Sequence, residues 1–297
     1  MTGVVNLLKP PGMTSQNAVT HIKRILGARK AGHAGTLDPG ACGVLPVCLG
    51  RATRLAPYLA DGRKEYIAEL TLGTATDSLD SEGRATQTAP LRWCSHRALE
   101  DAMASLCGQI FQTPPAYSAV KVQGKPLYAY ARAGHAVAAA PRPVEIYSFE
   151  LLRGAGCGPF LFRICCSKGT YVRVLLADVA KRLGQVGHTS FLMRTQVGRF
   201  RAEDAVTFAD IESGRAGAHV QSVREAAPGE HIELPDNLYP LLQNGASVPG
   251  EKLATLHLAK EALYAVSCSG DFFGMGEYDG CALSLRTRVY DGVQESK

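Results

Sequence analysis

Near its N-terminus the chain reads Gly32-His33-Ala34-Gly35-Thr36-Leu37-Asp38-Pro39. The two glycines of this run let the backbone come close to a ligand, and the proline after Asp38 biases that residue toward extended backbone angles. A carboxylate held rigidly in such a loop is well suited to nucleophilic attack. A turn built on Asp38-Pro39-Gly40 is the alternative interpretation, because such turns are frequent.

The segments around this loop have strand-like and helix-like patterns. Alternation or short apolar runs predict strands at Val4–Leu8, Val44–Leu49, Lys64–Leu72, Val144–Leu152, Phe160–Ser167 and Phe191–Val197. Helical spacing predicts a first helix, capped by Thr14 or Ser15, that runs to about Leu26. Further helices are expected at His96–Cys107, Leu127–Ala133 and Tyr171–Leu183. Strands outnumber helices without a regular β-α order, so the sequence predicts an α+β fold rather than a doubly wound one.

The chain is expected to divide into two domains. Residues 1–229 form the larger one, with a linker at 216–229 and an insertion at 113–143 that holds four basic side chains and no acid. Residues 230–297 carry short apolar segments separated by glycines, at Leu238–Leu242, Ala262–Ser267 and Ala282–Leu285. This pattern is typical of a small all-β module.

Charge is distributed unevenly between these two parts. Residues 1–229 contain 27 basic and 17 acidic side chains, whereas residues 230–297 contain 5 and 10. Within the first 60 residues Asp38 is the only acid, beside seven basic residues: Lys9, Lys23, Arg24, Arg29, Lys30, Arg51 and Arg54. Such a bias suits a polyanionic partner, because each neutralised phosphate releases a counterion. A merely solvated basic surface is the alternative.

The sequence also indicates the compartment. No stretch approaches the roughly 18 apolar residues of a membrane span, and the N-terminus lacks the features of a signal peptide. The nine cysteines are an odd number without a Cys-x-x-Cys pair, which favours a reducing compartment and no zinc site. Cys48, Cys107 and Cys268 lie among apolar residues, as buried thiols do. We expect a cytoplasmic protein.

Three further residues are candidates for a functional site. Arg173 could pair bidentately with a carboxylate and hold it ionised, or it could be a surface arginine. Tyr66 could stack on an extruded base and relay a proton, or it could be an ordinary core tyrosine. His33 could contact phosphate or fill the gap that an extruded base leaves, or it could be a loop histidine without a function.

Several known signatures are missing from the sequence. It has no Gly-x-x-x-x-Gly-Lys-Ser/Thr run, no His-Glu-x-x-His and no Gly-x-Ser-x-Gly. The acids of Asp77–Gly83 have the wrong spacing for a calcium loop. The residues alone therefore indicate a basic protein that handles RNA or nucleotides, and they do not name a reaction.

Seven motifs, in the right order over residues 4–200, strongly resemble the bacterial tRNA pseudouridine synthase B (TruB) family. They are Lys9–Gly12, Arg29–Pro39, Lys64–Tyr66, Gly73–Gly83, Pro114–Arg132, Cys166–Arg173 and Leu192–Gly198. The resemblance implies a pseudouridine synthase fold, with a mixed, mostly antiparallel sheet flanked by helices. It favours the catalytic interpretation of Asp38, Tyr66 and Arg173 over the alternatives.

The resemblance also implies a substrate and a mechanism. The protein is expected to grip the T-stem and loop of tRNA, flip out the uridine at position 55 and isomerise it to pseudouridine through a covalent bond to Asp38. Arg173 is expected to keep Asp38 charged, and Tyr66 to stack on the base and help with the C5 proton. Further RNA-binding residues implied are Lys9, His33, Thr36, Lys121, Tyr171 and Leu192. No cofactor, metal, membrane contact, guide RNA or obligate protein partner is implied, and a monomer is expected.

The C-terminal residues lie where this family often carries a PUA-like β module. Gly270–Glu277 and Arg286–Tyr290 faintly resemble that module. The excess of acids in residues 230–297 argues against a strong phosphate-binding role for it.

Three other functions stay open. A guide-RNA-dependent pseudouridine synthase is disfavoured by the insertion Pro114–Arg132, which resembles the stand-alone bacterial form. A tRNA-folding chaperone with little catalysis is disfavoured because Asp38, Tyr66 and Arg173 are all present. A hydrolase that uses Asp38 as a general base lacks the paired carboxylate that such work usually needs.

Overall fold

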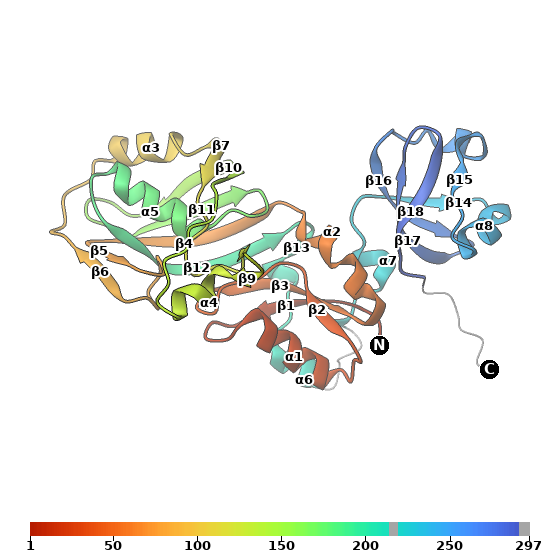
Figure 1. The fold of residues 1–297 in the computed structure, drawn as a ribbon, viewed down its shortest axis with the longest axis horizontal. Coiled ribbons are helices and arrows are strands. Elements are labelled where there is room, and N and C mark those ends of the chain that lie inside the picture. The colour runs from red at the N-terminus through yellow and green to blue at the C-terminus, as the bar shows by residue number, and fades with distance from the viewer. Residues whose placement is uncertain (214–218, 291–297) are drawn as a thin grey trace.

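The computed structural model describes residues 1–213 and 219–290, which form a larger and a smaller lobe (Figure 1). The larger lobe is built on a nine-stranded sheet with the order β1-β3-β12-β4-β11-β10-β7, extended by β2 on β3 and β13 on β12. Its strands are β1 (Gly3–Lys9), β2 (Ala31–His33), β3 (Cys42–Leu49), β4 (Lys64–Leu72), β7 (Gly108–Gln112), β10 (Arg142–Arg153), β11 (Phe160–Cys166), β12 (Gly187–Val197) and β13 (Phe200–Arg201). Within this sheet, as far as the structure describes it, only the pairing of β3 with β12 is parallel, so the sheet is mixed and mostly antiparallel, as predicted.

Strand β4 lies near the middle of this sheet and keeps its predicted bounds. Alternate residues, from Lys64 through Tyr66 to Leu72, are buried, and the residues between them are only half-buried. The buried face packs under α3 (His96–Ala104) and α5 (Val172–Arg182), which lie on one side of the sheet (Figure 1). The period-two pattern of β4 therefore fixes which of its side chains face the helices.

Helix α1 (Ser15–Ile25) confirms the predicted first helix. The backbone N–H of Asn17 donates to Thr14 Oγ1 at 3.0 Å, so Thr14 is the N-cap. Ala18, Val19 and Ile22 are buried in a core that α1 shares with β1 and β3. The short helix α6 (Phe208–Glu212) lies beside α1.

The predicted helix at His96–Cys107 is shorter in the structure. Helix α3 ends at Ala104 and the chain turns through Ser105 and Leu106 into β7. Gly108, the first residue of β7, has φ +83°, a left-handed conformation that favours glycine. The helical periodicity of the sequence does not show where this turn begins.

The predicted insertion at 113–143 contains little regular structure. It comprises a small hairpin of β8 (Lys121–Val122) and β9 (Lys125–Pro126), followed by α4 (Leu127–Arg132). Helix α4 agrees with the predicted Leu127–Ala133. A second hairpin, β5 (Thr74–Thr76) with β6 (Ala85–Thr88), carries the acidic loop at 77–83.

The smaller lobe contains a five-stranded sheet with the order β14-β16-β17-β18-β15. Its elements are β14 (Glu230–Leu234), α8 (Tyr239–Gln243), β15 (Val248–Pro249), β16 (Ala262–Cys268), β17 (Asp271–Tyr278) and β18 (Ala282–Arg288). One apolar segment of the all-β pattern, Leu238–Leu242, is helical instead. Pro240 lies in the first turn of α8, where a proline is tolerated, whereas it would remove a ladder hydrogen bond from a strand.

The two lobes are joined by a short helix and by an apolar core that both lobes share. Of the predicted linker, 216–229, residues 216–218 lie outside the described residues, while Val223–Ala226 form helix α7 with a capping box. Val223 and Ala226 belong to a core cluster that also includes Phe272 and Met275 of the smaller lobe. The lobes therefore share apolar contacts.

Two of the basic residues expected to favour a polyanion tie the lobes together instead. Arg51 Nη1 donates to Tyr290 O at 2.6 Å, and Arg54 Nη1 donates to Arg288 O at 2.7 Å. Both arginines come from residues 50–55, just ahead of α2 (Ala56–Ala60). Arg51 and Arg54 therefore count toward the basic charge of the larger lobe but also hold the two lobes together.

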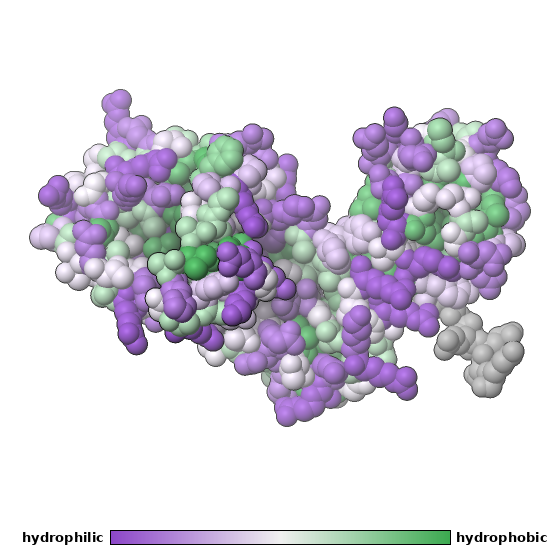
Figure 2. Space-filling view, viewed as in Figure 1, coloured by the Kyte–Doolittle hydropathy of each residue, from purple (hydrophilic) through white to green (hydrophobic). Residues whose placement is uncertain are grey.

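On the face shown in Figure 2, hydrophilic residues are spread over both lobes, with hydrophobic residues between them. Within residues 1–213 and 219–290, no helix is both long and apolar enough to cross a membrane. All nine cysteines are free thiols, and Cys48 and Cys268 are buried as predicted. Cys107 is exposed, contrary to the prediction, because it follows α3 in the turn that leads to β7.

Candidate active site

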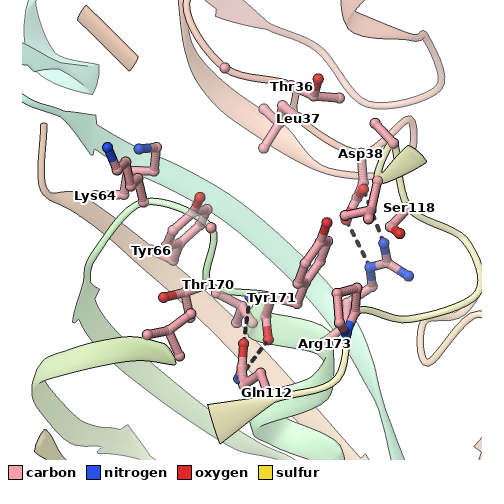
Figure 3. Close-up of a pocket in the computed structure, with 18 of the residues that line it drawn as sticks. Thr36, Leu37, Asp38, Lys64, Tyr66, Gln112, Ser118, Thr170, Tyr171 and Arg173 are labelled. Carbon is pink, nitrogen blue, oxygen red and sulfur yellow. Dashed lines mark hydrogen bonds and ion pairs between the residues drawn. The ribbon is translucent and has the colours of Figure 1, made fainter. Parts of the chain in front are cut away.

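A cavity of about 640 Å³ opens between the β2–β3 loop, strands β4 and β12, the start of α5 and the insertion after β7 (Figure 3). Four of the predicted site residues reach it from four different segments: Asp38, Tyr66, Arg173 and Leu192. Thr36 and Tyr171 line it as well. The sheet thus brings together residues that lie far apart in the sequence.

The loop that carries Asp38 is held on both sides of that residue. Ser15 Oγ accepts from the backbone N–H of Leu37 at 2.8 Å and donates to its carbonyl at 2.9 Å. Lys9 Nζ donates to Pro39 O at 3.2 Å. The residues that flank Asp38 are therefore fixed by buried side chains of β1 and α1.

Asp38 pairs with Arg173 through two hydrogen bonds. Arg173 Nε donates to Oδ2 at 2.8 Å and Nη2 donates to Oδ1 at 3.1 Å. The Arg173 side chain is 3% exposed and that of Asp38 is 33% exposed. A bidentate pair of this kind fixes the plane of the carboxylate, and here it leaves one side of Asp38 open to the cavity.

Two further hydrogen bonds of Arg173 go to backbone carbonyls. Nη2 donates to Tyr117 O at 3.0 Å and Nη1 donates to Ser78 O. Arg173 is thereby tied to the insertion and to the acidic loop between β5 and β6. The orientation of the guanidinium depends on both of these loops.

The structure adds Asp80 to the site, a residue not singled out from the sequence. Asp80 Oδ2 lies 3.7 Å from Arg173 Nε, and Asp80 Oδ1 accepts from Ser78 Oγ and, at 3.1 Å, from the backbone N–H of Glu82. Arg173 thus lies between two carboxylates. The sequence could have pointed to Asp80 only through the family-like motif Gly73–Gly83, and nothing in that motif distinguishes Asp80 from its acidic neighbours.

Gln112 is a second addition from the structure. This buried residue, at the end of β7, accepts from Tyr171 N at 2.9 Å through Oε1 and donates to Tyr171 O at 3.3 Å through Nε2 (Figure 3). The two bonds fix the backbone immediately ahead of α5. They therefore help to set the position from which Arg173 projects.

Tyr66 lies across the cavity from Arg173 (Figure 3). Burial raises the pKa of the Tyr66 phenol to about 12, and the nearby charge of Arg194 opposes this rise. Tyr66 as a whole is 7% exposed. At neutral pH Tyr66 is an uncharged phenol with an apolar ring at the edge of the cavity, which suits stacking on a base.

Three of the predicted RNA-binding residues lie outside the cavity lining. Lys9 differs most from the expectation: it is fully buried, and its Nζ donates to Pro10 O, Met13 O and Pro39 O at 2.8, 2.9 and 3.2 Å. Its contacts support the Asp38 loop from inside the protein. Lys121 is exposed on the β8–β9 hairpin, and His33 is half-buried at the end of β2 with Nδ1 lacking a partner in the described part of the chain.

Comparison with solved structures defines the class of the protein. An H/ACA RNP bound to a substrate RNA contains a chain with a TM-score of 0.72, 25% identity and coverage of 97% of this chain and 84% of its own. A Cbf5–Nop10–Gar1 complex gives a TM-score of 0.73 at 28% identity with the same coverage. The fold is that of a pseudouridine synthase.

Comparison with sequences defines the family. Residues 23–172 match the N-terminal domain of the TruB family of pseudouridylate synthases. The tRNA pseudouridine synthase B of Caldanaerobacter subterraneus subsp. tengcongensis is 41% identical, over 94% of this chain and 95% of its own length. That of Geobacillus kaustophilus is 46% identical over 83% and 90%. The chain belongs to the TruB family.

Proposed function

We propose that this protein isomerises uridine to pseudouridine at position 55 in the T loop of tRNA and that it works without a guide RNA. The observation that carries the proposal is the bidentate pair of Arg173 with Asp38, whose carboxylate keeps one side open to the cavity. Relatives that match 94% and 83% of this chain bear the name tRNA pseudouridine synthase B. The proposal assigns Asp38 as the nucleophile.

The reaction breaks one bond to the ribose and makes another. The uridine leaves the T loop and enters the cavity, at an unstacking cost of a few kcal/mol. Asp38 forms a covalent bond with the nucleoside, the N1–C1′ bond breaks, the base rotates and a C5–C1′ bond forms. The bond to Asp38 breaks, C5 loses its proton and N1 gains one from solvent, so the product is an isomer and no oxidant or reductant is needed.

The other site residues have supporting roles in this proposal. Arg173 holds the carboxylate of Asp38 in one plane and favours its charged form. The ring of Tyr66 stacks on the flipped base, and its hydroxyl takes part in removal of the C5 proton. Leu192 and Thr36 shape the wall of the cavity that receives the base.

The guide-RNA-dependent function is the second candidate. The structural neighbours include an H/ACA RNP, but at 25% and 28% identity they are more distant than the curated relatives at 41% and 46%. This difference supports independent action on tRNA. A monomer that acts in the cytoplasm without an obligate protein partner is part of the proposal.

A tritium-release assay on a T-arm transcript labelled with 5-tritiated uridine tests the function. Purified protein should release tritium from this transcript with no other RNA present. A matched transcript with cytidine at position 55 should release none above background. Release that begins only after a guide RNA is added contradicts independent action, and binding without release supports the chaperone alternative.

A further inference from the structure

Arg194 is a fully buried arginine at the base of the cavity. Among the ion pairs of residues 1–213 and 219–290 none includes Arg194. Burial of a charge without a carboxylate partner is costly, so such a group needs hydrogen bonds that satisfy it. The partners of these hydrogen bonds therefore decide what Arg194 does in the fold.

The hydrogen bonds of Arg194 go to the loop that carries Asp38 and to strand β3, which follows it. Nη1 donates to Thr36 O at 3.1 Å and Nη2 to Gly35 O at 3.2 Å, both on the N-terminal side of Asp38. Nε donates to Val44 O at 2.9 Å, on the C-terminal side. The planar guanidinium therefore spans the two arms of the loop and sets their separation.

The same arginine lies directly opposite Tyr66. Strands β12 and β4 are antiparallel, and Arg194 and Tyr66 are register partners between them. Directly opposed residues project on the same face with Cβ atoms about 5 Å apart. The charge of Arg194 opposes the rise in the pKa of Tyr66 that burial causes, while Asp38 and the thiol of Cys166, at the end of β11, add to that rise.

The backbone around Arg194 is also built for close approach. Gly43 of β3, its parallel register partner, has φ +112°, where a glycine is favoured. A Cβ at that position would collide with the backbone of Arg194. Strands β3 and β12 can thus lie close enough for the guanidinium to reach both arms of the Asp38 loop.

We propose that Arg194 is a positioning residue, which holds the Asp38 loop and the Tyr66 ring in one geometry and keeps a fixed positive charge beside both. It acts through Asp38 and Tyr66 rather than on the RNA. This role rests on the proposed function, because the reaction defines the geometry that must be kept. Misplacement of a reacting group by about 1 Å can lower a rate by about 100-fold.

The test compares Arg194→Met, which keeps the bulk without charge or donors, with Arg194→Lys, which keeps the charge without the fork. Tritium release from the labelled T-arm transcript gives kcat and KM, and thermal unfolding gives stability. Arg194→Met should lower kcat by about 100-fold with KM within about threefold, and Arg194→Lys should recover about tenfold of that loss. A kcat near wild type in Arg194→Met overturns the proposal.

Asn6→Ala separates positioning from stability. Asn6 is buried, and its Nδ2 donates to Arg201 O at 2.8 Å, away from the cavity lining. Asn6→Ala should unfold at a lower temperature than wild type and keep the wild-type kcat. If Asn6→Ala and Arg194→Met both lose kcat in proportion to the stability they lose, the proposal is overturned. If Arg194→Met does not fold, folded Arg194→Lys tests the positioning role. A lowered kcat in Arg194→Lys supports that role, and a wild-type kcat overturns it.

Wild-type protein provides the last distinction. If it releases no tritium, the proposed function fails, and the role of Arg194 fails with it. If it turns over normally while Arg194→Met is unimpaired, only the role of Arg194 fails.

Discussion

Asp38 and Arg173 are 135 positions apart in the sequence and form a two-pronged ion pair, with Nε–Oδ2 and Nη2–Oδ1 distances of 2.8 and 3.1 Å. The arginine is buried while the carboxylate stays partly exposed to the cavity. Hydrogen bonds between charged groups are stronger than neutral ones, and the fork adds a fixed orientation. The arrangement presents the free side of Asp38 to whatever enters the cavity.

Replacement of Arg173 by lysine should lower kcat with little change in RNA affinity. Lysine keeps the charge but cannot form the fork, so the carboxylate of Asp38 loses its fixed plane. We expect kcat to fall by about 100-fold, as when a preorganised donor is removed. Tritium release and filter binding measure the two effects.

Arg182→Lys is the matched control for that variant. Arg182 is exposed at the last turn of the same helix, α5, and outside the cavity lining. It should leave both kcat and affinity unchanged. Equal kcat values for Arg173→Lys and wild type would contradict the role of the fork.

Asp80→Asn tests the second carboxylate beside Arg173. Asparagine can keep the bonds from Ser78 and Glu82 but removes the charge that lies 3.7 Å from Arg173 Nε. A fall of kcat by about tenfold is expected, since a hydrogen bond or charge pair of this kind contributes about 1.4 kcal/mol. Asp77 lies in the same loop, and its Oδ1 accepts from the backbone N–H of Arg84. Asp77→Asn should leave kcat unchanged. Similar values for the two variants would show that only loop structure matters.

Tyr66→Phe tests the hydroxyl separately from the ring. The apolar ring stays, so RNA binding and thermal stability should be close to wild type. We expect kcat to fall by about 100-fold because a positioned acid–base group contributes to that extent. Tyr264→Phe is the control, since Tyr264 is a buried tyrosine of the smaller lobe whose hydroxyl accepts from Ala259 N at 2.7 Å. Full activity of Tyr66→Phe would limit Tyr66 to stacking.

The pH dependence of stability should carry a contribution from Lys64. Burial, and then the charge of Arg194, lowers the pKa of Lys64 from 10.5 to about 8. Between these values the unfolded chain holds a proton that the folded protein has released, so this group makes the free energy of unfolding rise with pH. The difference between wild type and Lys64→Met should rise by about 1 kcal/mol from pH 8 to pH 9.

Urea unfolding at pH 7, 8 and 9 measures that difference. Lys252→Met, at an exposed position of the smaller lobe, should show no such slope. A flat or falling difference between wild type and Lys64→Met would mean that Lys64 keeps its proton in the folded protein.

Local elements were predicted well because their patterns are local. The alternation of Lys64–Leu72 and the cap of α1 at Thr14 both depend on neighbouring residues, and the structure confirms them. Leu238–Leu242 was assigned to the wrong element because a short apolar run does not distinguish a strand from a helix. Cys107 was expected to be buried because its neighbours in sequence are apolar, but the turn in which it lies is at the surface.

The candidate site depended on long-range contacts that no local pattern reveals. Neither Asp38 nor Arg173 identifies its partner, and only the order of family-like motifs suggested that they meet. Lys9 shows the limit of that approach, since the resemblance implied that it binds RNA, whereas Lys9 is buried and donates to three backbone carbonyls. Asp80 can be assigned to the site only from the fold, which places the β5–β6 hairpin beside Arg173. In the same way, Arg194 can be assigned only because strand β12 lies beside Tyr66.

The central claim is that Asp38 is the nucleophile, and Asp38→Asn tests it most directly. Asparagine fills the same space and can accept from Arg173, so the folded protein should bind T-arm RNA about as well as wild type. The measurement is tritium release from 5-tritiated uridine in that RNA at saturating protein. We predict no release above background from Asp38→Asn, and release near the wild-type rate would contradict the assignment.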